Sequence, residues 1–142
     1  MRAGQPSRAG RGIPSRRAAD RIVIQTEGNC MEIERILAPI DFSYRSRNEL
    51  QWAISLAMRF RAELISLHVV PPEVVKNALE WKNETWEGMR ADYSSQACQL
   101  VEEIEAEAPA LGLDHSEVVV AGKPVEEILD AIRKLDIDLI VM

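Results

Sequence analysis

Cysteine is scarce in this chain, and Cys30 and Cys98 are its only examples. Two thiols this far apart provide neither a disulfide framework nor a metal cluster. Disulfides are rare in the cytoplasm, where thiols are kept reduced. We therefore expect two reduced cysteines without a functional role, in a cytoplasmic protein.

Long hydrophobic runs are also absent, since none approaches the roughly 20 residues of a membrane-spanning helix. The longest candidate, residues 64–70, contains Ser66 and His68 and is typical of a strand. We therefore expect no membrane partner for this chain.

Motifs that identify common enzymes are missing: G-x-S-x-G, H-E-x-x-H, C-x-x-C and G-x-x-x-x-G-K-S/T do not occur. His68 falls within an expected strand and His115 within an expected turn. Neither histidine has a partner visible in the sequence, so we interpret both as structural. No general base or cluster of metal-binding carboxylates is evident, and we expect no enzymatic activity.

The net charge is −6, but the charged residues are unevenly distributed along the chain. Residues 1–30 carry six arginines and two acidic residues, or +4, which leaves −10 for the rest. An acidic body repels phosphate backbones, and nucleic acid is therefore not an expected partner.

Residues 1–30 are rich in Gly, Pro, Ser, Arg and Ala without sustained periodicity, which predicts a disordered extension. This stretch is rich in arginine and poor in acids, like an organelle transit peptide, but it lacks the hydrophobic core of a secretory signal. Met31 directly precedes the first expected element, so we favour a start codon placed too far upstream. The expected domain comprises residues 31–142.

From residue 31 onward, short apolar runs alternate with amphipathic segments. Residues 36–40, 64–70, 118–120 and 139–142 predict strands. The pattern Ser46-x-x-Glu49 predicts a capped helix start, and Pro124 predicts the start of another helix. The expected buried faces of the three helices are Leu50, Ala53, Ile54, Ala57 and Met58; Trp86, Met89, Tyr93, Ala97, Leu100, Val101 and Ile104; and Val125, Ile128, Leu129 and Ile132.

This β-α-β-α-β-α-β order predicts an α/β fold with a doubly wound parallel sheet. Continuous apolar strands imply a sheet that is covered on both faces. Such sheets bind ligands outside the carboxyl ends of their strands, where the winding reverses. We therefore expect any site at that edge.

Four segments in order resemble the universal stress protein family. They are the residue ranges 35–43 (RILAPIDFS), 67–70 (LHVV), 120–128 (VAGKPVEEI) and 136–142 (DIDLIVM). The resemblance extends from Met31 to Met142. It implies a sheet in the order 3-2-1-4-5, with the fifth strand absent from this chain and ATP bound beside strands 1 and 4.

The resemblance also implies which residues contact the nucleotide. Pro39 and Asp41 are expected to line the adenosine pocket, where the Asp41 carboxylate accepts polar hydrogens. Val69 is expected to contact adenine through its backbone. The residue alone allows a second interpretation, in which Asp41 is a turn carboxylate that caps a neighbouring amide.

ATP-binding members of the family carry a glycine loop, G-x2-G-x9-G-S/T, directly after strand 4. Its backbone amides hold the phosphates. This loop is expected to begin after Met142, so we interpret the chain as a family domain that is incomplete at its C-terminus. Any ATP binding by this chain is then expected to be weak.

The resemblance leaves more than one function open. The first is a cytoplasmic stress-response protein that binds ATP as a regulatory ligand, hydrolyses it slowly if at all, and forms a homodimer when full length. The second is an interaction module of the same fold that does not depend on nucleotides. A pyrophosphatase-type ligase requires a Ser-Gly-Gly-rich loop after the first strand, and residues 41–44 (DFSY) do not provide one.

Overall fold

A four-stranded parallel sheet forms the centre of the computed structural model, which describes residues 23–26, 29–107 and 112–142. The strands lie in the order β5-β4-β3-β6. This arrangement confirms the predicted doubly wound α/β fold with the order 3-2-1-4. The strands are β3 (Arg35–Pro39), β4 (Glu63–Val70), β5 (Asp114–Ala121) and β6 (Leu139–Ile140).

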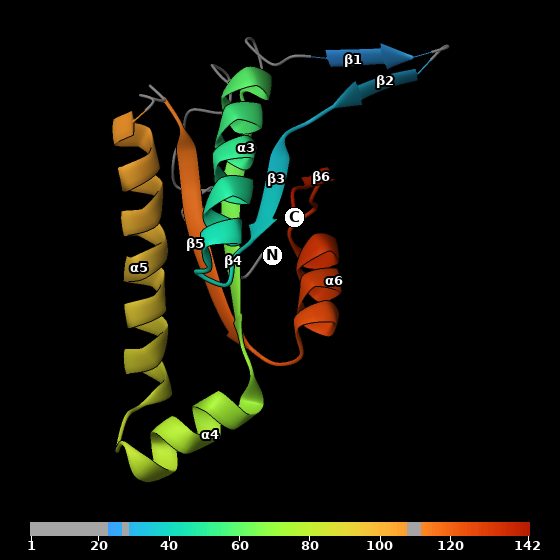
Figure 1. Cartoon of the computed structure of the whole chain (residues 1–142). Coiled ribbons are helices and arrows are strands. Elements are labelled where there is room, and N and C mark those ends of the chain that lie inside the picture. Colours follow the sequence, from blue (N-terminus) through green and yellow to red (C-terminus); the bar gives the residue numbers. More distant parts are fainter. Residues whose placement is uncertain (1–22, 27–28, 108–111) are drawn as a thin grey trace.

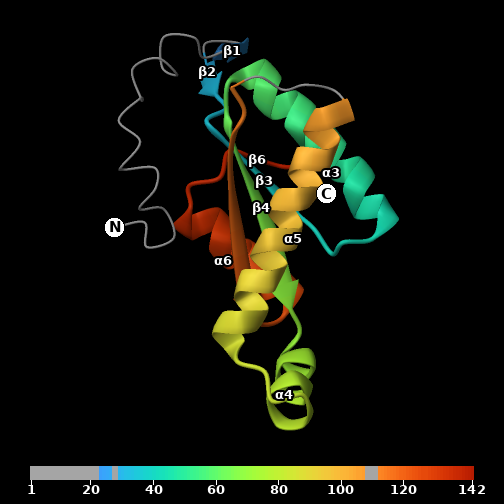
Figure 2. The same cartoon turned by 90° about the vertical axis from the view of Figure 1, so that its left-hand side faces the viewer.

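Helices cover the two faces of the sheet unequally (Figures 1 and 2). The connections from β3 to β4 and from β4 to β5 run in one direction across the sheet, and they place α3 (Tyr44–Phe60) and α5 (Trp86–Glu107) on one face. The connection from β5 to β6 runs in the opposite direction. Because crossovers are right-handed, it places α6 (Pro124–Lys134) on the other face.

The larger part of the core lies between the sheet and the α3 and α5 helices. Leu50 and Ala53 of α3 are fully buried against Ile36 and Leu64 of the sheet. The predicted helical spacing thus identified most of the face that packs. The buried members of this cluster are Ile33, Ile36, Ala38, Ile40, Leu50, Ala53, Ile54, Ala57, Ala62, Leu64, Ala97, Val101 and Ile104.

The start of α3 differs from the predicted capping box at Ser46 and Glu49. Ser43 is the capping residue, and its hydroxyl accepts a hydrogen bond from the Ser46 amide at 3.2 Å. Glu49 is paired with Arg45 on the helix surface instead. The predicted cap was wrong by about one turn. Ser43 is also a preferred capping residue, and its hydroxyl reaches the amide three residues further along the chain.

The buried face of α6 also differs from the prediction. Val125 and Leu129, which we expected inside, are 70% and 53% exposed. Ala131 and Leu135 are buried instead, together with the partly buried Ile128 and Ile132. The helix is rotated because the wide apolar stripe of its sequence allows several orientations, and the sheet beneath it selects one.

A helix that we did not predict, α4 (Pro72–Trp81), follows β4 directly. Pro72 occupies the first turn of α4, where proline is well tolerated. Val75 and Ala78 pack in a hydrophobic cluster against the rest of the domain, while Trp81 is 82% exposed. The helix lies beyond the carboxyl ends of β4 and β5 (Figure 1).

A short antiparallel hairpin precedes the main sheet. It consists of β1 (Val23–Thr26) and β2 (Asn29–Glu32), which pair with Val23 opposite Glu32. The prediction that residues 1–30 lack regular structure was therefore wrong for residues 23–26 and 29–30, and β2 crosses our domain boundary at residue 31. A composition averaged over 30 residues concealed a β-favouring Val-Ile pair. Residues 1–22 and 27–28 lie outside the described part of the chain.

Candidate functional site

The winding of the sheet reverses between β3 and β6, which are neighbours although they are far apart in sequence. Chain segments that leave the carboxyl ends of these two strands diverge, which opens a crevice in sheets of this type. The turn of residues 40–43 leads from β3 into α3 at this edge. The edge of the sheet at which we expect a site therefore includes this turn.

Asp41 is an exposed residue of this turn, and its carboxylate is hydrogen-bonded. Oδ1 accepts a hydrogen bond from the Ser43 amide at 2.9 Å. Hydrogen bonds from Ser43 lower the pKa of Asp41, so the carboxylate is ionised at neutral pH. An ionised carboxylate has about four lone-pair directions on its two oxygens, and one contact to an amide leaves capacity for a ligand.

The cap interpretation of Asp41 is thus correct as a description of its contact with Ser43. It does not exclude the ligand interpretation, because a bond to the Ser43 amide fixes the carboxylate at the edge of the sheet. A fixed acceptor is what recognition of sugar hydroxyls requires.

Pro39 and Val69 lie on neighbouring strands at the same edge of the sheet. Pro39 is the last residue of β3 and pairs in register with Leu67 of β4, two residues before Val69. Val69 packs in the cluster on the α6 side of the sheet. Pro39 follows the α6-facing Leu37 by two residues and therefore points to the same side. The structure brings these two positions to one edge and places Asp41 just beyond it.

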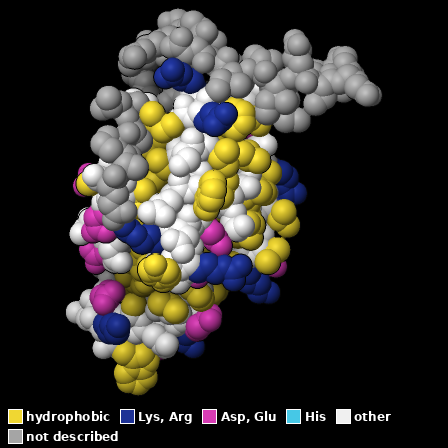
Figure 3. All heavy atoms as spheres, turned by 45° about the horizontal axis from the view of Figure 1, so that its top comes forward, with side chains coloured by type: hydrophobic (Ala, Val, Ile, Leu, Met, Phe, Trp, Pro, Cys, Tyr) yellow, Lys and Arg dark blue, Asp and Glu magenta, His cyan; other side chains and the backbone are white. Residues whose placement is uncertain are grey.

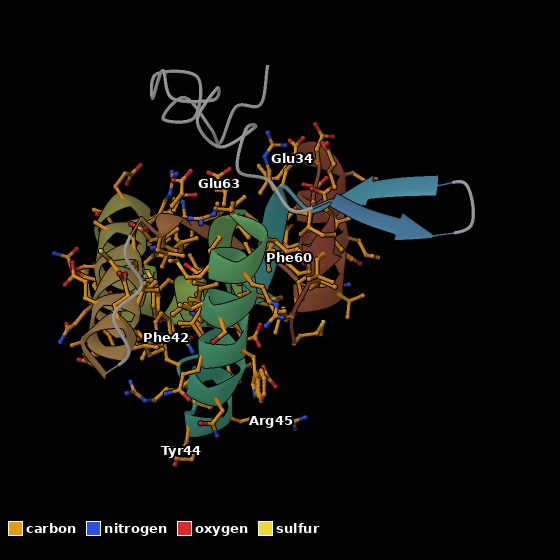
Figure 4. The ribbon with its side chains drawn as sticks, turned by 90° about the horizontal axis from the view of Figure 1, so that it is seen from above. Glu34, Phe42, Tyr44, Arg45, Phe60 and Glu63 are labelled. Atoms are coloured by element: carbon orange, nitrogen blue, oxygen red, sulfur yellow. The ribbon has the colours of Figure 1, made fainter. Side chains whose placement is uncertain are left out.

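We did not predict a cluster of aromatic side chains that lies on the opposite side of the same turn. The His68 Nδ1 atom lies 2.9 Å from the Ile40 carbonyl oxygen, and the rings of Phe42 and Tyr93 pack against the imidazole. Figure 4 shows Phe42 between α3 and α5, whereas Tyr44 and Arg45 point outward from the start of α3. No sequence signal reveals a bond to a backbone carbonyl 28 residues away.

His115 lies in β5, so the prediction that it lies in a turn was wrong. Its Nε2 atom is 3.2 Å from the Ser66 hydroxyl oxygen, and its Nδ1 atom is 3.5 Å from Glu117 Oε2. This Ser-His-Glu order resembles a hydrolase triad. The side chain of Ser66, however, is 1% exposed in a packed core, so a substrate cannot reach the hydroxyl. The structural interpretation of His115 therefore stands.

A cysteine side chain, that of Cys98, also lies in the described part of the chain. The Cys98 thiol is half-buried, and desolvation raises its pKa, so it stays protonated and poorly nucleophilic. Within residues 23–26, 29–107 and 112–142, no group of three or more His, Cys, Asp or Glu side chains is arranged to hold a metal ion. Among the helices of the same described residues, none combines the length and apolarity needed to cross a membrane.

Comparison with known proteins identifies the family. A model of the universal stress protein family matches residues 32–142, which is most of the chain. The chain belongs to the universal stress protein family. The segments around Asp41, His68 and Gly122, from which we inferred this resemblance, all lie within the match.

Solved structures of the universal stress protein fold agree with this assignment. UspA from Lactobacillus plantarum has 27% sequence identity and a TM-score of 0.55, with 76% of this chain and 74% of that chain covered. The hypothetical protein MJ0577 has 27% identity and a TM-score of 0.52, with 77% of this chain and 73% of that chain covered. A universal stress protein solved in complex with cAMP has 19% identity and a TM-score of 0.52, with 75% of this chain and 69% of that chain covered. The comparison with curated proteins found no match.

Proposed function

We propose that this universal stress protein binds an adenine nucleotide as a regulatory ligand in the response to stress, at the carboxyl edge of β3 and β4. The carrying observation is the position of Asp41: an ionised, exposed carboxylate, fixed by the Ser43 amide, at the point where the winding of the sheet reverses. The structure of a relative with the same fold in complex with cAMP, an adenine nucleotide, supports the ligand class.

In this proposal, each residue supports a different part of the ligand. The Asp41 carboxylate accepts hydrogen bonds from the ribose hydroxyls, which are neutral donors. Pro39 provides an apolar wall without an amide hydrogen. The backbone of Val69, at the adjacent strand end, reads the polar edge of adenine. Together these groups recognise the adenosine part of a nucleotide and do not depend on its phosphates.

Calorimetric titration of the chain with adenosine, AMP and ATP tests the proposal, with guanosine as a control for base selectivity. Asp41→Ala should weaken adenosine binding about tenfold, since a hydrogen bond to a charged group contributes about 1.5 kcal/mol or more. Glu102→Gln removes a comparable exposed carboxylate from the last turns of α5, at the opposite end of the sheet, and should leave binding unchanged. Absence of adenosine binding by the unaltered chain would contradict the proposal.

Binding without turnover is the activity that we propose. The buried Ser66-His115-Glu117 cluster cannot accept a substrate, and Asp41 is bonded to a backbone amide and not to a nucleophile. We further propose that the protein acts in the cytoplasm and forms a homodimer. The acidic body of the chain disfavours nucleic acid as a partner.

An interaction module that needs no nucleotide is the second candidate function. Large aromatic side chains are exposed on two helices: Tyr44 (81%) and Trp52 (71%) on α3, and Trp81 (82%) on α4. Figure 3 shows hydrophobic side chains gathered on the face crossed by α3. A shallow apolar hollow also lies between α4 and the turn after β5, where Val75 and Leu79 approach Ala121 and Gly122. Titration without any adenosine binding would favour this second function.

A further inference from the structure

The peptide group between Ile40 and Asp41 is held on both of its sides. Its carbonyl oxygen lies 2.9 Å from His68 Nδ1, and its amide donates to the Ser46 hydroxyl oxygen at 3.1 Å. A peptide group is planar, so two bonds at opposite edges fix its rotation. This rotation sets the direction in which the Asp41 side chain leaves the backbone.

The imidazole of His68 is itself held in place by two aromatic rings. The Phe42 ring meets it edge-on with 4.7 Å between centroids, and the Tyr93 ring of α5 is 4.6 Å away on a tilted plane. Phe42 adopts a left-handed backbone conformation, with φ of 64°, which is unfavourable for an aromatic residue. Packing of its ring on His68 and Tyr93 offsets the cost of this conformation.

His68 acts as a donor in this contact, because a carbonyl oxygen can only accept. An imidazole that donates from Nδ1 does so whether it is neutral or protonated. The contact with Ile40 therefore suits a fixed structural support for the turn.

We propose that His68 is a positioning residue for nucleotide binding, which orients Asp41 through the Ile40 carbonyl. This inference rests on the proposed function. Neither the family match nor the expected adenosine contacts assign a role to His68. The imidazole lies on the α3 and α5 side of the sheet, opposite Pro39 and Val69, so it acts on the ligand through the turn and not by direct contact.

Two substitutions separate the hydrogen bond from the packing. His68→Asn keeps an N–H donor near the position of Nδ1, whereas His68→Leu fills similar space without a donor. His115→Asn changes the other histidine, which is bonded to Ser66 away from the site, and serves as the matched control. Each variant of the 142-residue chain is titrated with adenosine in a calorimeter after its folding has been checked by circular dichroism.

His68→Leu is expected to weaken adenosine binding about tenfold, which corresponds to one lost hydrogen bond. His68→Asn is expected to restore most of this affinity, and His115→Asn should have none of this effect. A double-mutant cycle gives the decisive readout: in an Asp41→Ala background, His68→Leu should cause no further loss. A merely structural role of His68 predicts additive losses.

The outcomes distinguish this inference from the proposed function. Wild-type binding together with unchanged affinity in a folded His68→Leu variant, or additive losses in the cycle, would overturn the positioning role alone. Lack of binding by the wild-type chain would overturn the proposed function and the inference with it. If His68→Leu does not fold, His68→Thr replaces it, because threonine suits a strand but its hydroxyl is too short to reach Ile40.

Discussion

Arg35 of β3 and Glu63 of β4 form a buried ion pair, with Nε of the arginine 3.5 Å from Oε1 of the glutamate. Both side chains are almost inaccessible, at 2% and 4% exposure. Arg35 Nη1 donates to the Leu135 carbonyl oxygen at 2.8 Å, while Nε and Nη2 make no hydrogen bond within the described part of the chain. The pair lies at the amino end of the sheet, opposite the proposed site. Because two nitrogens of Arg35 have no hydrogen bond among the described residues, the loss of Glu63 would leave its charge poorly compensated.

Replacement of one member of this pair should be strongly destabilising. Glu63→Gln leaves the Arg35 guanidinium buried, with the Leu135 carbonyl oxygen 2.8 Å and the exposed Asp136 carboxylate 3.7 Å from Nη1. We expect a loss of about 3–5 kcal/mol in the free energy of unfolding, measured by urea denaturation. The double replacement Arg35→Met with Glu63→Leu should cost less than the single one. A single variant as stable as the wild type would show that the charge is compensated otherwise.

Stability should fall between about pH 6.5 and pH 4 because of His115. Burial lowers the pKa of this histidine to about 4 in the folded chain, whereas the unfolded value is about 6.5. As pH falls through this window, the unfolded state binds the proton first, so folding loses up to about 3 kcal/mol. His115→Asn should remove this part of the pH dependence in urea denaturation.

The neighbouring Glu117 acts in the opposite direction. Burial raises the pKa of its carboxyl group, so its protonation favours the folded state as pH falls. Comparing wild type with His115→Asn at each pH keeps Glu117 in both proteins, so the difference reports His115 together with its 3.5 Å contact to Glu117. Parallel stability curves for the two proteins would contradict a depressed pKa of His115.

Adenosine should bind this chain at least as well as ATP. The proposed contacts come from Asp41, Pro39 and Val69, and the only charge among them is the negative carboxylate of Asp41. A triphosphate gains no charge-assisted bond from these three residues, and such bonds contribute about 1.5–3 kcal/mol each. Competition calorimetry gives the ratio of the two affinities. Binding of ATP that is many times tighter than that of adenosine would require a phosphate contact outside these residues.

Gly122, in the turn between β5 and α6, should not tolerate a side chain. Its φ of 155° is a conformation that favours glycine, and its amide donates to the Val70 carbonyl oxygen at 3.0 Å. A Cβ atom would lie 2.5 Å from Glu127 Oε1. Gly122→Ala should cost about 1–3 kcal/mol of stability. In a Glu127→Ala background the steric part disappears, and the remaining loss in urea denaturation reports the backbone conformation alone.

The candidate site could be predicted only in part from the sequence. Pro39, Asp41 and Val69 were identified because the resemblance to the family implies contacts at their positions. The support from His68 could not be predicted, because its partner is a backbone carbonyl that folding brings close. Whether the three expected residues contact a nucleotide remains a prediction.

The sequence by itself determined the alternation of the four main strands with α3, α5 and α6 and the doubly wound parallel sheet, while the strand order was implied by the resemblance to the family. Short apolar runs and amphipathic segments specify these features locally, and right-handed crossovers limit how they connect. Only the tertiary structure decided the rotation of α6, the capping of α3 by Ser43 and the burial of Arg35 with Glu63. Each of these depends on contacts between residues on different elements, or on a choice between equally good local partners. Such choices are made by the packed neighbours and not by local sequence preference.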